Sequence, residues 1–174
     1  MTLNSSGIRD ISWVLGISVT TVSSALRKAY QQLAPLKKPE KVVSVEVDEQ
    51  WSYVGNKGFQ RWLWIAWDRH RKQVLDYVIG FRTDATGFHL LQKLEPYQIE
   101  RFYTDHWPFY EKAISPEKHR IGKRYTQQVE RNNLNLRTHL KRLQRRTICF
   151  SKSDEMHKAV IGLYMHQAMI QHQF

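Results

Sequence analysis

The chain has 174 residues, of which 41% are hydrophobic and 12% aromatic, which suits one sizeable core with a small appendage and excludes general disorder. Lysine and arginine outnumber aspartate and glutamate by 27 to 16, a formal net charge of +11, so we expect a densely negative partner, nucleic acid above all. The single cysteine excludes an internal disulfide and a cysteine-rich zinc site, and no apolar run has the length of a membrane span.

Residues 7–30 predict two short helices joined by a tight turn, because apolar residues recur at helical spacing on either side of Gly16. Gly16 can adopt the positive φ that such a turn needs, and Ser18 suits the N-cap of the second helix. An ordinary helical hairpin shares this periodicity, but small polar residues on the outer face favour a DNA-binding helix-turn-helix within residues 1–32. The side chains expected to contact DNA there are Ser18, Thr20, Thr21, Arg27 and Lys28.

A linker and then an alternation of strands and helices follow. Residues 33–41 contain two prolines and three lysines and predict the linker. Valine-rich and bulky apolar stretches predict strands, of which the first three are expected to be antiparallel neighbours, over residues 41–48, 61–68, 73–81, 99–104 and 118–124. Helical periodicity predicts helices over residues 84–94, 108–114, 126–145 and 154–170. This order predicts a mixed α/β domain over residues 42–174.

Three acidic residues stand out by position. Asp48 closes the first predicted strand and Asp105 the fourth, where a carboxylate can point into an open cleft while the strand holds it. Glu130 lies near the start of the long helix and is the one acid among ten lysines and arginines between residues 118 and 146. Glu130 could form an ion pair or complete a metal site, and on spacing alone a metal site and a surface charge are equally good explanations of it.

Three converging carboxylates would suit Mg²⁺ or Mn²⁺, which prefer oxygen ligands and keep water and phosphate as the remaining ones. Two such ions about 3.5–4 Å apart can clamp both the attacking and the leaving oxygen at a phosphodiester. Asp48, Asp105 and Glu130 are therefore the candidate catalytic and metal-binding residues. Arg137 and Lys141 share a helix face with Glu130 and could grip a phosphate, although a solvated basic face has the same spacing.

Several neighbouring side chains have two interpretations. The acids that compete for a place in the site, because they lie on or near the same strands, are Glu46, Glu49 and Asp68. Asp84 is expected to be a helix N-cap. His106 could touch metal or phosphate or be structural, and Trp51 and Tyr53 either anchor a loop or contact DNA.

Five separated motifs, in the right order, resemble the transposases of the insertion sequence one family. They are DEQWSYVG (48–55), QRWLW (60–64), TDHWPFYE (104–111), KRYTQQVERNNLNLRTHL (123–140) and FSKS (150–153). The resemblance extends from about residue 7 to the end. It implies an RNase H-like catalytic domain using Mg²⁺ or Mn²⁺, with Asp48, Asp105 and Glu130 as the catalytic triad and Arg137 as the basic residue of the same helix. Two departures are a histidine at 106, where glycine is usual, and the lack of a Cys-rich zinc ribbon before the helix-turn-helix.

The resemblance implies a DNA transposase that binds the terminal inverted repeats of an insertion element, cuts there and joins the 3′ ends to target DNA. Lys123 and Arg124 join the expected DNA contacts. By family analogy we expect a homo-oligomer, in the cytoplasm with the nucleoid and away from membranes. The alternatives are a truncated, non-cutting DNA-binding regulator of transposition, which the intact acids disfavour, and a structure-selective nuclease, which the helix-turn-helix disfavours.

Overall fold

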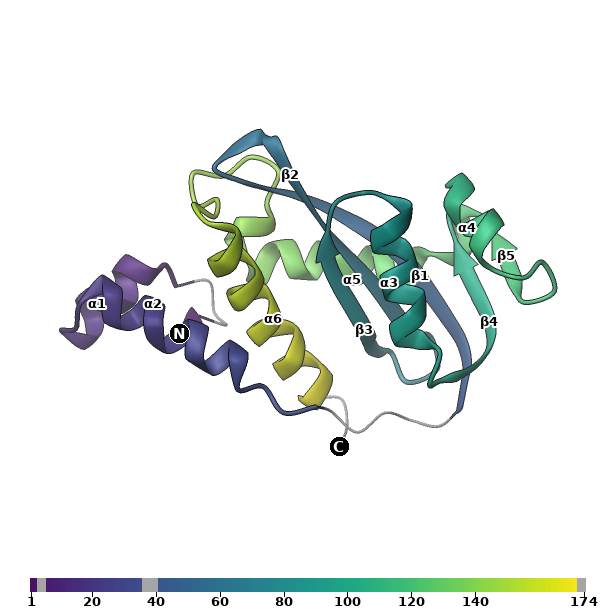
Figure 1. Ribbon diagram of the computed structural model, residues 1–174, viewed down its shortest axis with the longest axis horizontal. Coiled ribbons are helices and arrows are strands. Elements are labelled where there is room, and N and C mark those ends of the chain that lie inside the picture. Colours follow the sequence, from purple (N-terminus) through teal and green to yellow (C-terminus); the bar gives the residue numbers. More distant parts are fainter. Residues whose placement is uncertain (3–5, 36–40, 172–174) are drawn as a thin grey trace.

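The computed structural model describes residues 1–2, 6–35 and 41–171, so most of the predicted linker lies outside the described residues (Figure 1). Two helices come first, α1 (Ile8–Leu15) and α2 (Val19–Gln31). Gly16 makes the turn between them at φ 64°, and Ser18 caps α2 by accepting a hydrogen bond from the Thr21 amide at 3.0 Å. The predicted helix-turn-helix course of the backbone is therefore confirmed.

A five-stranded mixed sheet of order β3-β2-β1-β4-β5 forms the body of the protein. Its strands are β1 (Lys41–Val54), β2 (Asn56–Asp68), β3 (Gln73–Gly80), β4 (Gln98–Thr104) and β5 (His119–Ile121). The first three are antiparallel neighbours, as predicted, because short connections join them, whereas β4 and β5 extend the sheet in parallel from the other side of β1.

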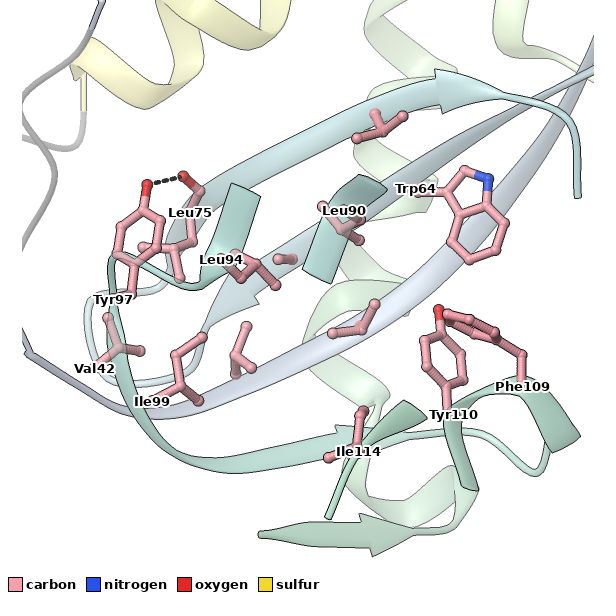
Figure 2. Close-up of a cluster of buried hydrophobic side chains, with 14 residues drawn as sticks. Val42, Trp64, Leu75, Leu90, Leu94, Tyr97, Ile99, Phe109, Tyr110 and Ile114 are labelled. Atoms are coloured by element: carbon pink, nitrogen blue, oxygen red, sulfur yellow. Dashed lines mark hydrogen bonds between the residues drawn. The ribbon is translucent and has the colours of Figure 1, made fainter. Parts of the chain in front are cut away.

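Helices cover both faces of this sheet (Figure 1). They are α3 (Asp84–Leu94) and α4 (Pro108–Ala113) on one face, and α5 (Gln127–His139) and α6 (Asp154–Gln171) on the other, with short 3₁₀ turns η2 (Lys123–Tyr125) and η3 (Lys141–Leu143) at either end of α5. Side chains of β2 alternate between two cores, with Trp64 packed toward α3 and α4 and Leu63 toward α5 and α6. In the first core Trp64, Phe109 and Tyr110 gather at one end (Figure 2). A mixed sheet of this order between helical layers confirms the expected RNase H-like architecture.

Two element boundaries differ from the sequence-based expectation and matter for the site. Asp48 does not end its strand, because β2 begins at Asn56 and pairs with β1 as far as Val54 in one long hairpin. The long helix ends at His139, since Leu140 adopts an extended backbone at φ −122°, ψ 92° and is buried in the second core. The predicted stripe of the helix is buried there as expected, but its last turn has become η3.

The helix over residues 84–94 has its predicted bounds, although its N-cap is Thr83 and not Asp84. Thr83 has the extended backbone of a cap, at φ −135°, ψ 156°, and Asp84 is already helical. No helix in the described part of the chain is both long and apolar enough to cross a membrane.

Helix α2 packs against α6 and so joins the first two helices to the sheet domain. The ring of Tyr30 lies so close to Gly162 that a Cβ there would come within 2.1 Å of its Cε2. Arg27 forms an ion pair with Glu155 at 3.0 Å, and His166 Nε2 lies 2.9 Å from the carbonyl oxygen of Ala34. Because Gly162 has no side chain, α2 and α6 can approach each other closely at this crossing.

Candidate active site

The two predicted aspartates converge because β1 and β4 are parallel neighbours. Their register pairs Glu46 with Tyr103, and two residues further along it would pair Asp48 with Asp105. The strand β4 ends at Thr104, so β1 has an open edge beside Asp48. Carboxylate oxygens of Asp48 and Asp105, together with one of Glu49, lie within 4.8 Å of one another. The end of β4 thus leaves three carboxylates together beside the central strand β1.

Helix α5 lies across this edge and brings Glu130 toward it. The Val129 amide donates to Glu46 Oε2 at 2.8 Å, and one turn later Asn133 Nδ2 donates to Asp48 Oδ2 at 2.7 Å. Glu130 lies between these contacts along the helix and accepts a hydrogen bond from Thr126 Oγ1 at 3.1 Å. Its carboxylate is exposed and outside the 4.8 Å group, but near enough for its charge to act on Asp48.

Burial and mutual repulsion disfavour the ionised form of these carboxyl groups. Burial, reinforced by the negative charges of Asp105 and Glu130, raises the pKa of Asp48 from 3.8 to about 6. Buried, mutually repelling carboxylates favour any partner that supplies positive charge. All the donors are hard oxygen atoms, which is the ligand set that Mg²⁺ and Mn²⁺ prefer, so the residues present fit a divalent-cation site.

Glu49 is a fourth carboxylate of the site, which the sequence reasoning treated only as a competitor. Its side chain is 2% exposed, accepts a hydrogen bond from the hydroxyl of Tyr110, and forms an ion pair with Arg82 at 3.2 Å. Burial, with the charges of Asp105 and Asp48, raises the pKa of Glu49 to about 7. Strand alternation turns Glu49 to the face opposite Asp48, and only the open edge beside β4 lets both reach one point. Its position directly after Asp48 was the signal available in the sequence.

Of the other acids, Glu46 lies on the same side of β1 as Asp48 and is held by Val129 and by Arg69, whose Nε is 3.2 Å from its Oε1. Asp68 is buried at the far end of β2, where it accepts bonds from the amides of His70 and Arg71. Both are therefore committed to structural contacts. His106 is exposed in the loop after Asp105.

The predicted DNA-contacting residues fall into two groups. On α2, the exposed side chains are Ser18, Thr20, Thr21 and Lys28, whereas Arg27 is engaged with Glu155. Around α5, the exposed side chains are those of Lys123, Arg124 and Lys141, with Lys141 in η3 instead of the helix. Arg137 is half-buried, its Nε has no hydrogen-bond partner, and burial lowers its pKa while the charge of Asp48 raises it. Among the predicted DNA-contacting residues, Arg137 is thus one whose charge interacts with that of Asp48.

Residues 41–171 match the model of the IS1 transposase family. The chain is 51% identical to the insertion element IS1 2 protein InsB of Escherichia coli strain K12. The alignment spans 125 residues and covers 72% of this chain and 75% of that protein. It is 50% identical over 125 residues to the insertion element IS1 protein InsB of Shigella sonnei, covering 72% and 95% respectively.

Two solved structures are similar in backbone course at low identity. The catalytic core domain of BIV integrase aligns with a TM-score of 0.43 and 15% identity, over 69% of this chain and 82% of that one. A chain of the simian T-cell lymphotropic virus intasome in complex with PP2A regulatory subunit B56 gamma aligns with a TM-score of 0.42 and 17% identity, over 72% and 53%.

Proposed function

The chain belongs to the IS1 transposase family, and we propose that it cuts DNA at the ends of an insertion element and joins the 3′ ends to target DNA. The convergence of Asp48 and Asp105 at the open edge of β1, with Glu130 close enough to perturb Asp48, is the observation that carries this proposal. The three acids would hold two Mg²⁺ or Mn²⁺ ions. Those ions, when bound, would stabilise the charge on the oxygens of the phosphodiester and favour deprotonation of water or a 3′-hydroxyl.

The protein's own contribution is to hold each acid in place. Asn133 orients Asp48 through its side-chain amide, the Trp107 amide donates to Asp105 Oδ1 at 3.0 Å, and Thr126 orients Glu130. Each acid is thus positioned by a donor from its own loop or from the helix that crosses it, which limits reorganisation when a substrate phosphate arrives. Arg137, beside Asp48, is suited to bind a phosphate oxygen.

DNA recognition is assigned to two groups of basic and polar side chains. Residues 1–32 would read the terminal inverted repeats through α2, and residues 42–174 would hold the reacting strand with Lys123, Arg124, Arg137 and Lys141. Arg27 would have to exchange Glu155 for a phosphate, so end binding would break this ion pair between α2 and α6. Such a protein would work at the chromosome in the cytoplasm, and as more than one copy, because two element ends must be joined.

The test is a nicking assay on a duplex that carries the ends of the element encoding the chain, with Mn²⁺ or Mg²⁺. Asp105→Asn should abolish nicking and leave binding of the same duplex intact, because the amide cannot hold the cation but alters little else. Glu111→Gln, an exposed acid of nearby α4, is the matched control and should cut normally. Cutting by Asp105→Asn at the wild-type rate would refute the site. Binding without nicking by the wild type would instead favour the non-cutting regulator.

A further inference from the structure

An aromatic surface adjoins the carboxylates, and its side chains have no part in the chemistry proposed above. Trp51 and Trp62 are directly opposite each other in the β1–β2 ladder, two residues beyond the pair Glu49–Trp64, so they share the sheet face of α3 and α4. Both are partly exposed. Together with Arg82 and Trp107 we call them the tryptophan surface.

Arg82 links two members of this surface, Trp62 and Trp107. Its guanidinium lies 5.0 Å from the ring centroid of Trp62 and 4.7 Å from that of Trp107, and Arg82 is itself exposed. A planar cation between indole rings is held in a fixed orientation, and the Arg82 guanidinium remains partly exposed although it pairs with Glu49. The patch therefore combines ring faces with a cation, the combination that binds a nucleic-acid strand through base stacking and phosphate attraction.

The tryptophan surface begins beside the site. Arg82 forms its ion pair with Glu49, and Trp107 donates its backbone amide to Asp105. Trp51 follows Asp48 by three residues, about 10 Å along the strand. A strand whose phosphodiester lay at the carboxylates would thus have its next nucleotides over the tryptophans.

We propose that Trp51 and Trp62 stack on unpaired bases of the DNA strand next to the phosphodiester that is cut, an inference that rests on the proposed function. Bases within a duplex cover one another's faces, so only unpaired or extruded nucleotides can stack on these rings. The net charge of +11 and the exposed Arg82 fit a polyanionic occupant better than a second copy of this equally basic chain.

The first test measures binding alone, without metal, so it does not depend on cutting. A fluorescent single-stranded oligothymidine and a duplex of equal length are titrated with the full chain in EDTA. Trp51→Leu and Trp62→Leu should each weaken single-strand binding about fivefold to a hundredfold and leave duplex binding nearly unchanged. Trp51→Phe, which keeps a ring, should retain most of the affinity.

The second test uses cutting. Trp51→Leu should nick a fully paired end slowly, and mismatches that unpair the bases beside the cut should restore most of its rate, which a merely misfolded variant could not show. Unchanged single-strand affinity in both leucine variants, or an equal loss for duplex, would overturn the proposal, as would a change of oligomeric state in Trp51→Leu. A protein that binds single strands through Trp51 but cuts nothing would refute the proposed function and leave this inference standing.

Discussion

Replacing Asp48 by asparagine should stabilise the metal-free protein at alkaline pH, although it should destroy activity. Burial raises the pKa of Asp48 from 3.8 to about 6, so the folded protein keeps a proton that the unfolded chain has lost across that interval. Stability therefore falls as pH rises through this window, and above pH 6 the whole cost is present. A shift of roughly two pKa units corresponds to about 3 kcal/mol.

Asparagine is nearly the same size as aspartate and cannot ionise, so it escapes this cost. Asn133 Nδ2, which now donates to Asp48, can donate to the new side-chain carbonyl instead, and Asn133 Oδ1 has no partner and can accept from the new amide. We therefore expect Asp48→Asn to raise the free energy of unfolding by up to about 3 kcal/mol at pH 8 and by under about 1 kcal/mol at pH 4.

Urea denaturation in EDTA at the two pH values measures this gain. The exposed Asp84→Asn, in the first turn of α3, serves as control and should change stability by less than about 1 kcal/mol. Adding Mn²⁺ at a hundred times its dissociation constant should stabilise the wild type by about 2.7 kcal/mol and the variant far less. No gain in the free energy of unfolding at pH 8, or the same gain at both pH values, would show that burial does not raise the pKa of Asp48.

Two further predictions concern the helices that flank the site. Asn133→Ala removes the 2.7 Å hydrogen bond to Asp48, and a manganese titration should show affinity about 10- to 100-fold weaker; unchanged affinity would mean that Asp48 needs no such support. Gly162→Ala should lower the denaturation midpoint because its Cβ would meet the Tyr30 ring at 2.1 Å, whereas in a Tyr30→Ala background it should raise stability by up to about 1 kcal/mol through helix propensity. The same sign in both backgrounds would contradict the packing of α2 on α6.

Local patterns predicted most of the elements. The helix over residues 84–94, the capped turn at Gly16 and Ser18, and the antiparallel order of the first three strands depend on neighbours in the chain, so spacing and turn residues reveal them. The predicted end of the first strand at Asp48 was wrong, because β1 and β2 form one long hairpin that turns at Gly55, φ 73°, and the pairing between them carries β1 past Asp48 to Val54.

Asp48, Asp105 and Glu130 were identifiable in the sequence by residue type, by position in their predicted elements and by the motifs around them. The parallel register of β1 with β4 brings Asp48 and Asp105 together, and the hydrogen bonds that lay α5 across β1 bring Glu130 near enough for its charge to act on Asp48. The same open edge admits Glu49, whose strand position alone turns it away from Asp48. The type of each side chain can be identified along the sequence. Which side chains lie close together depends on pairings between distant segments, and these form only in the folded sheet.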